Sequence, residues 1–170
     1  LTALLTENVD AFNEALIADF GARPIEMNQV AEVAGLLPDL AYIRARLGRW
    51  MRPKRMLAST LLGLPTVVEP TPLGVIGIIG PWNFPIALVA QPAAAALAAG
   101  NRVMIKFSDM TPHTGEVFKE CAKRYFSPEE FLVVVVSRQV RCALRPRSSG
   151  RRRGTVSRAR IQLPRVSGGC

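Results

Sequence analysis

The strongest constraint on the fold is an alternation of strand-like and helix-like segments between residues 73 and 136. Three segments are short, apolar and rich in β-branched residues, and the segments between them have helical length and helical start or stop signals. The strand-like segments are residues 73–79, 102–107 and 131–136, and the helical ones are residues 85–99 and a helix capped by Thr111. Strands that alternate with helices form a parallel sheet with right-handed crossovers. The pattern therefore predicts an α/β fold that contains the first βαβαβ half of a doubly wound, Rossmann-like sheet, left incomplete in this chain. Because the first strand is continuously apolar, we expect it to be covered on both faces.

The residues ahead of this unit predict helices. Residues 2–20 repeat apolar side chains at helical spacing, and residues 24–51 form a second helical stretch that Pro38 splits. Within the second stretch and just after it, a run of basic residues is interpreted as a solvated face. We expect three parts in the chain: N-terminal helices with the start of a β arm (1–70), the half sheet (71–137) and a basic tail (138–170).

The stretch from Thr71 to Asn101 contains no charged residue. A membrane helix needs about 20 continuous apolar residues, and this stretch is interrupted repeatedly by glycine and proline. The composition therefore favours a buried strand, a turn and a buried helix, and we expect no membrane span.

The net charge of +9 comes entirely from the end of the chain. Residues 138–170 contain 10 arginines, no lysine and no acidic residue, whereas residues 1–137 contain 12 basic and 13 acidic residues. The tail has no hydrophobic periodicity, so we expect it to be disordered, or to be the product of a frame shift in a GC-rich gene. An alternative is a non-catalytic binding protein that uses the tail to hold nucleic acid or an anionic surface. Because the tail has no aromatic residue on which bases could stack, nucleic acid is an unfavoured partner.

Two turns follow the first two strands of the predicted sheet, at the edge where ligands bind in doubly wound folds. In the turn from Gly80 to Pro85, the amide of Asn83 could stabilise a developing oxyanion, or it could simply bond to the backbone of its own turn. In the turn from Lys106 to Asp109, the lysine and the acid could hold a ribose, or they could form an ordinary loop ion pair. No GxGxxG fingerprint follows the first strand.

The three cysteines and the single histidine do not form a metal set or a poised thiolate. Cys121 falls on the apolar side of a helix, together with Val117 and Tyr125, and is interpreted as core filler. Cys142 and Cys170 lie in the tail without a neighbouring base or orienting acid, so neither is expected to be a nucleophile. With one histidine and no CxxC spacing, we expect no metal site. Sparse cysteines favour a reducing compartment, and we expect a cytoplasmic protein.

These motifs resemble those of the aldehyde dehydrogenase family. Residues 72–85, PLGVIGIIGPWNFP, resemble the first cofactor strand and turn of that family, and residues 95–106, AALAAGNRVMIK, resemble the next helix end and strand. Residues 18–21, ADFG, and 50–54, WMRPK, are similar to the class that includes coniferyl and fatty-aldehyde dehydrogenases. The resemblance covers residues 1–136 and does not extend into the tail.

The resemblance implies NAD(P)-dependent oxidation of an aldehyde, coniferyl aldehyde or another aromatic or aliphatic one, to the carboxylic acid. Residues 71–137 would then be the first half of an NAD(P)-binding domain, and the full-length protein would be a homodimer. Asn83 matches the amide that stabilises the oxyanion. Cofactor-binding roles are implied for Ile79, Gly80, Pro81, Trp82, Lys106, Ser108 and Asp109.

Two further predictions follow from positions at which this chain differs from the family pattern. Where the family reads Lys-Pro-Ser-Glu, this chain has Phe107 and Asp109, which predicts a looser turn and weaker NAD binding. Restoring proline and glutamate at these two positions should tighten cofactor binding. The family's nucleophilic Cys, its general-base Glu and its second glycine turn come later than the residues matched here. The chain also begins at Leu1, so we expect a fragment that is inactive alone.

Overall fold

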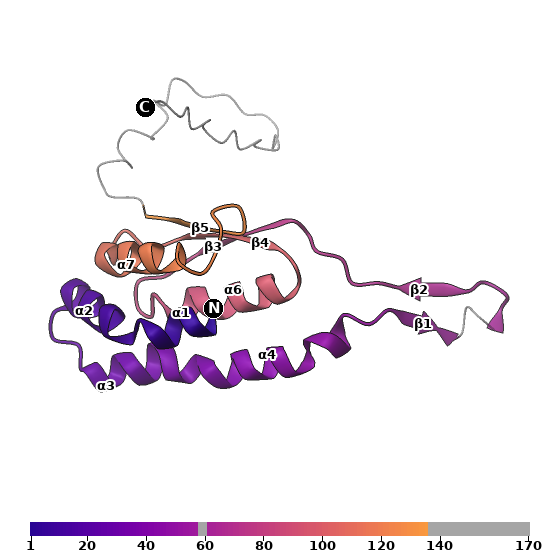
Figure 1. The fold of residues 1–170 in the computed structure, drawn as a ribbon, viewed down its shortest axis with the longest axis horizontal. Helices are drawn as coiled ribbons and strands as arrows, with labels where there is room; N and C mark the ends of the chain where they lie inside the picture. The colour runs from indigo at the N-terminus through magenta and orange to yellow at the C-terminus, as the bar shows by residue number, and fades with distance from the viewer. Residues whose placement is uncertain (58–60, 136–170) are drawn as a thin grey trace, which may run out of the picture.

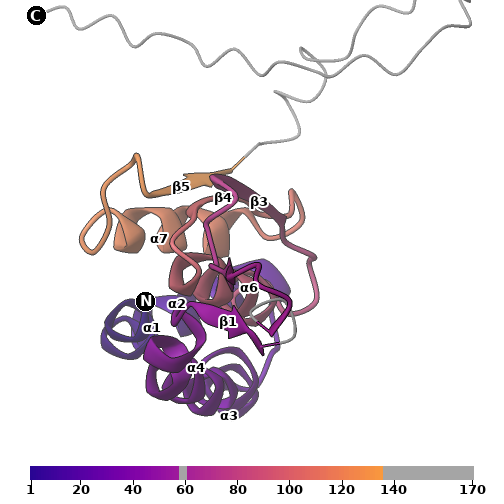
Figure 2. The same ribbon diagram turned by 90° about the vertical axis from the view of Figure 1, so that its right-hand side faces the viewer.

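The computed structural model describes residues 1–57 and 61–135. The expectations for the tail, including those for Cys142 and Cys170, lie outside the described residues. Three layers lie on top of one another: a parallel sheet, a layer made by helices α6 and α7, and the N-terminal helices beneath them (Figures 1 and 2). The elements in chain order are α1 (Thr2–Glu7), α2 (Val9–Phe20), α3 (Ile25–Asn28), the π-helix η1 (Gln29–Val33), the 3₁₀ helix η2 (Ala34–Leu36), α4 (Leu37–Trp50), β1 (Lys54–Met56), β2 (Thr66–Val68), β3 (Val75–Ile79), α6 (Ala87–Ala98), β4 (Arg102–Lys106), α7 (Pro112–Ala122) and β5 (Phe131–Val134).

The sheet confirms the predicted βαβαβ unit. Its strands run parallel in the order β3-β4-β5, and α6 and α7 are the two crossovers. Ile79, the last residue of β3, pairs with Lys106, the last residue of β4. The two turns singled out in the sequence therefore begin side by side at the carboxyl edge of the sheet.

In the described part of the chain, helices cover only one face of this sheet (Figure 2). In β4 and β5 alternate side chains are buried against the helices, as with Ile105 and Phe131. In β3 only Ile78 is buried, while Val75 and Ile79 are 60% and 80% exposed. The expectation that the first strand is covered on both faces was therefore wrong for this structure, because its second face meets no helix among the described residues.

The N-terminal helices are more divided than the sequence pattern predicts. The single helix expected over residues 2–20 is two helices, and Asn8 lies at the break with its buried side-chain Nδ2 donating to the Leu4 carbonyl at 2.9 Å. The second stretch is interrupted by η1 and η2, directly before α4, which has Pro38 in its first turn. Proline has no N–H and clashes with a preceding helical turn, so the predicted split at Pro38 is confirmed.

An aromatic cluster joins the N-terminal helices to the sheet unit. The ring of Phe118 on α7 lies 5.8 Å from that of Phe12 on α2, 5.2 Å from that of Phe107 and 6.3 Å from that of Phe131. Phe118 is fully buried. The sequence pattern placed Val117, Cys121 and Tyr125 on the apolar side of this helix, and Cys121 is buried in the core, but the pattern did not include Phe118.

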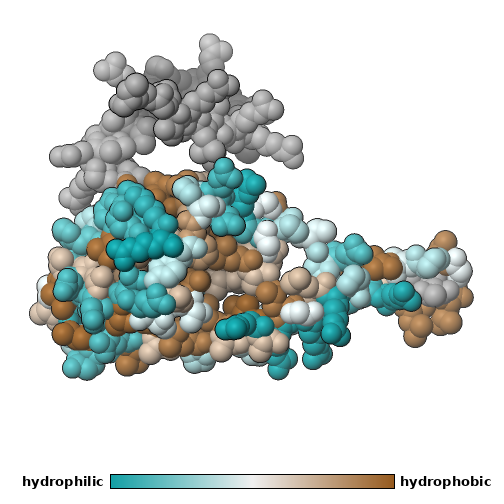
Figure 3. Space-filling view, viewed as in Figure 1, coloured by the Kyte–Doolittle hydropathy of each residue, from teal (hydrophilic) through white to brown (hydrophobic). Residues whose placement is uncertain are grey.

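Strands β1 and β2 form an antiparallel ribbon that extends away from the layers (Figure 1). Their residues are exposed, and brown apolar side chains gather at the far end of the ribbon in Figure 3. Large exposed apolar residues flank the strands here, namely Leu57, Leu61, Leu62 and Leu64. Within the residues that the structure describes, no helix has both the length and the apolar character that crossing a membrane requires.

Candidate active site

The two turns are joined by a main-chain hydrogen bond. The N–H of Gly80 donates to the carbonyl of Lys106 at 2.8 Å, which continues the ladder between β3 and β4 by one residue. A Cβ atom on Gly80 would lie 2.6 Å from Cγ1 of Val89 on α6, so only glycine fits at this close approach of strand and helix. The glycine therefore fixes how tightly the first turn packs against the helix that follows it.

Asn83 lies on the exposed side of the first turn. Its main-chain carbonyl accepts a hydrogen bond from Nη1 of Arg23 at 3.3 Å. Among the described residues its side-chain amide makes no hydrogen bond, which argues against the alternative of an asparagine that only bonds to backbone. The amide is open to solvent and available to a ligand.

Three predicted cofactor residues lie at the same edge of the sheet, at the end of β3 and in the turn that follows it. Ile79 and Trp82 are 80% and 54% exposed, and Pro81 between them is also exposed. Apolar side chains exposed in this way at the carboxyl edge provide a surface on which a flat or apolar ligand group could lie.

The second turn is braced by local hydrogen bonds. Lys106 Nζ donates to the Phe107 carbonyl at 3.1 Å, and Ser108 Oγ accepts from the Met110 N–H at 3.2 Å. Lys106, Ser108 and Asp109 are all half-buried, and they lie next to the first turn.

Phe107 is held by main-chain and core contacts, which does not fit the expectation of a looser turn. Its N–H, which a proline would lack, donates to the Val134 carbonyl at 3.2 Å, and its ring is fully buried against Phe118. The residue therefore adds a strand-to-strand hydrogen bond and a core contact at the position where flexibility was expected.

Supporting contacts come from the N-terminal helices and were not predicted from the sequence. Glu32 on η1 is fully buried, and its Oε2 accepts the N–H groups of Ile86 and Ala87 at the start of α6, at 3.1 and 2.9 Å. Its Oε1 lies 3.1 Å from Nη2 of Arg23, an ion-pair distance without hydrogen-bond alignment. Burial raises the pKa of Glu32 above its ordinary value, while the Ala87 N–H and the Arg23 charge act in the opposite direction. The only sequence signal was an acid placed among the apolar positions of a helix.

A second carboxylate from the N-terminal helices caps α7. Asp19 accepts the N–H groups of His113 and Thr114 at 3.0 and 2.8 Å and the Thr114 hydroxyl at 2.6 Å. Thr111 occupies the N-cap position, as predicted, but its hydroxyl makes no capping bond. The helix that follows the second turn is thus anchored by a residue more than 90 positions away in sequence.

Cys121 lies in the core, as predicted. It is 5% exposed, and burial raises the pKa of its thiol, which disfavours a thiolate nucleophile. Within residues 1–57 and 61–135, no three His, Cys, Asp or Glu side chains are grouped closely enough to hold a metal ion.

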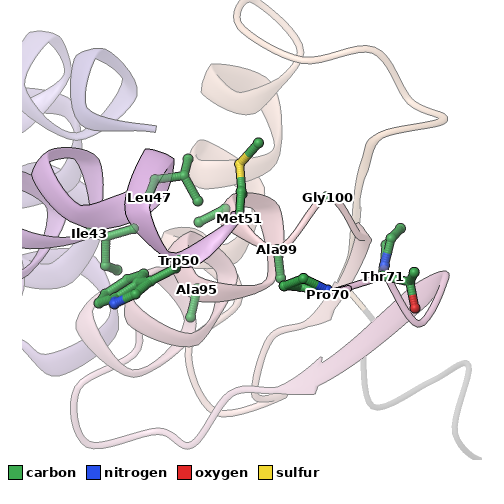
Figure 4. A pocket seen from close by; sticks show the side chains of 11 residues that line it. Ile43, Leu47, Trp50, Met51, Pro70, Thr71, Ala95, Ala99 and Gly100 are labelled. Atoms are coloured by element: carbon green, nitrogen blue, oxygen red, sulfur yellow. The ribbon is translucent and has the colours of Figure 1, made fainter. Parts of the chain in front are cut away.

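An apolar cavity of about 540 Å³ lies away from the two turns (Figure 4). It is lined by the end of α4, by the segment that leads into β3, and by the last turns of α6. Figure 4 shows Trp50 and Met51 on one side and Ala95 and Ala99 on another. Because Gly100 lines it and precedes β4, the cavity is at the amino-terminal ends of the strands and does not contribute to the site.

Comparison with known proteins identifies the family. The aldehyde dehydrogenase family profile matches residues 1–144, which includes a few residues of the segment expected to be unrelated. Coniferyl aldehyde dehydrogenase from Pseudomonas sp. (strain HR199 / DSM 7063) is 41% identical over 138 residues, covering 81% of this chain and 28% of that protein. Fatty aldehyde dehydrogenase HFD1 from Saccharomyces cerevisiae is 34% identical over 125 residues, covering 72% of this chain and 23% of that protein.

Solved structures show the same relationship. The substrate-bound AldH of Staphylococcus aureus superposes with a TM-score of 0.75 at 26% identity, over 84% of this chain and 31% of that one. The chain thus spans less than a third of the length of each of these relatives. The resemblance read from the turn motifs is confirmed, and the chain belongs to the aldehyde dehydrogenase family.

Proposed function

We propose that this chain forms the part of an NAD(P)-dependent aldehyde dehydrogenase that carries the oxyanion donor and the adenosine side of the cofactor site. The observation that carries the proposal is the adjacency of the two turns at the carboxyl edge of the sheet, joined from Gly80 to Lys106. Doubly wound sheets bind dinucleotides at this edge. Family membership makes aldehyde oxidation the expected reaction.

The residues present are suited to a dinucleotide. The carboxylate of Asp109 could accept hydrogen bonds from ribose hydroxyls, Lys106 adds a positive charge, and Ser108 adds a hydroxyl. Ile79 and Trp82 offer an exposed apolar surface next to them. When bound, the nicotinamide cofactor would accept the hydride that leaves the aldehyde carbon.

Asn83 would act on the other reactant. As a nucleophile adds to the aldehyde, negative charge develops on the carbonyl oxygen, and a side-chain N–H held in place stabilises that charge. Arg23 already holds the main-chain carbonyl of Asn83, so the turn that carries the amide needs little reorganisation at the moment of reaction. The buried thiol of Cys121 is not suited to be that nucleophile. We therefore propose that the 170-residue chain by itself does not oxidise aldehydes.

A hybrid enzyme tests this function. In it, residues 1–136 of this chain replace the aligned segment of the Pseudomonas coniferyl aldehyde dehydrogenase, and formation of NADH or NADPH from coniferyl aldehyde is followed by absorbance. Asn83→Ala should lower kcat by about 100- to 1,000-fold, the usual cost of removing an oxyanion donor. Gln91→Ala is the matched control, because it removes an exposed amide of α6 that contacts Asp39 away from the turns.

Three outcomes would contradict the proposal. A folded hybrid that forms no reduced cofactor would show that these residues do not support aldehyde oxidation. An Asn83→Ala hybrid with unchanged kcat would show that the amide does not act on the reacting oxygen. Reduced cofactor formed by the isolated 170-residue chain would show that the chain supplies its own nucleophile.

Two properties of the full-length protein are also proposed. We propose a homodimer for the full-length protein, supported by the apolar side chains at the end of the exposed ribbon, with light scattering of the hybrid enzyme as its test. We propose a cytoplasmic location, supported by the free, buried Cys121. Fractionation of cells that produce the protein would test the location.

A further inference from the structure

The start of α6 is held by a charged group from another part of the chain. Glu32 is fully buried and accepts two main-chain N–H groups of Ile86 and Ala87, 54 and 55 positions away. Burying a carboxylate is costly unless it is paired and hydrogen-bonded. A serine, threonine or aspartate at the N-cap would satisfy a helix start more simply. The use of a distant buried glutamate therefore needs a reason beyond capping.

Arg23 provides that reason. Its guanidinium has one nitrogen, Nη2, 3.1 Å from Glu32 Oε1, and the other, Nη1, 3.3 Å from the carbonyl of Asn83. The same group lies over the ring of Phe84, at 5.1 Å from its centre. Glu32 and Arg23 thus hold the main chain on both sides of the Phe84–Pro85 step, immediately next to the proposed oxyanion donor.

We propose that Glu32 and Arg23 are positioning residues for Asn83. The buried carboxylate fixes the guanidinium and the first turn of α6, and the guanidinium fixes the carbonyl of Asn83. Groups that act on a developing charge need placement to within about 0.5 Å, which an exposed turn does not provide unaided. This proposal rests on the proposed function, because only there does the placement of the Asn83 amide matter.

A purely structural role makes a different prediction. If the pair only joined η1 to α6, its loss would lower stability without a particular effect at Asn83. Glu32→Gln separates the two cases, because glutamine keeps an oxygen for the two N–H groups of α6 but has no charge to pair with Arg23.

The first measurement uses the full 170-residue chain, labelled with ¹⁵N. In Glu32→Gln and in Arg23→Lys, the side-chain NH₂ signal of Asn83 and the indole signal of Trp82 should shift or broaden. The indole of Trp50, on α4, should stay unchanged as an internal reference. Asp39→Asn is the matched control, because Asp39 also contacts α6, through Gln91 Nε2 at 2.8 Å, but away from the turn.

The second measurement uses the hybrid enzyme. Glu32→Gln and Arg23→Lys should each lower kcat between about tenfold and a hundredfold, as expected for a displaced catalytic group, with little change in the KM for the cofactor. Asp39→Asn should leave kcat unchanged. Because Arg23 is at the surface end of the pair, Arg23→Lys decides the question if Glu32→Gln does not fold.

The outcomes separate the positioning role from the function. If Asn83→Ala lowers kcat and neither pair variant does, the positioning role is wrong while the function stands. If Asn83→Ala itself has no effect, the proposed function is wrong. Unchanged Asn83 and Trp82 signals in both pair variants, or changes that are equally large at Trp50, would overturn the positioning role whatever the kinetics show.

Discussion

The close approach of β3 and α6 at Gly80 leaves no room for a side chain. In Gly80→Ala the new Cβ would lie 2.6 Å from Cγ1 of Val89, whereas ordinary carbon contacts are about 3.5–4 Å. Val89 is fully buried in α6, and a β-branched residue in a helix has one strongly preferred rotamer, so its side chain cannot turn away. The strand, the turn or the helix must therefore move.

The size of the effect follows from packing energetics. Overpacking of this kind costs about 1–3 kcal/mol, and we expect about 2 kcal/mol for Gly80→Ala. Val89→Ala removes two methyl groups from the core and should also cost about 2 kcal/mol. In the double variant the alanine at 89 has no Cγ1 to clash with. The double variant should therefore be destabilised by about 2 kcal/mol, whereas adding the two single effects gives about 4 kcal/mol. The difference, about 2 kcal/mol, is the coupling energy between the two positions.

Urea unfolding of the 170-residue chain, followed by far-ultraviolet circular dichroism, measures all three variants. Gly77→Ala is the matched control, since a Cβ at that position on β3 meets no atom within 4 Å. It should change stability by less than about 0.5 kcal/mol. A Gly80→Ala variant no less stable than Gly77→Ala, or a coupling below about 0.5 kcal/mol, would refute the packing argument.

Three further predictions follow from the supporting contacts. Phe107→Pro should destabilise the chain by more than about 3 kcal/mol in the same assay, because it removes a fully buried ring and the N–H bonded to Val134; a gain in stability would contradict this. Asp19→Ala should cost about 1–2 kcal/mol through the lost cap of α7, and Asp19→Asn should cost less; equal losses would show that the cap bonds are unimportant. Because the pKa of Glu32 is raised in the native state, native chains hold its proton more tightly than unfolded chains do. The contribution of Glu32 to the free energy of unfolding should therefore be greatest below its ordinary pKa of 4.5 and fall as the pH rises through its native pKa. Glu32→Gln should lack this trend. A free energy of unfolding that rises with pH over this range in the native sequence, but not in Glu32→Gln, would contradict the prediction.

The sheet and the edge that carries the site could be predicted because local patterns determine them. A continuous apolar run, followed by a proline-bounded turn and an alanine-rich helix, has few alternatives to a βα unit. The rule that parallel strands end at one edge then placed the turns of Gly80 and Lys106 together, and their hydrogen bond confirms it.

The supports of the site could not be predicted because they act across long sequence separations. Rules for helix starts search for a cap within a few residues, whereas Glu32 and Asp19 cap helices that begin more than 50 positions later. Phe118 was missed for a local reason. The predicted face of α7 was centred at Cys121, and Phe118, three residues earlier, lies about 60° around the helix from that centre, at the edge of the face.

The contact between Phe12 and Phe118 bears on how the chain would respond to a protease. The ribbon of β1 and β2 is the exposed connection between the N-terminal helices and the sheet unit, and exposed connections are where proteases cut. A single cut there would leave the aromatic cluster and the Asp19 cap intact, because each contains residues from both sides of the cut. The two peptides would then stay together as a non-covalent complementing pair. The segments that look separate along the sequence would come apart only on denaturation.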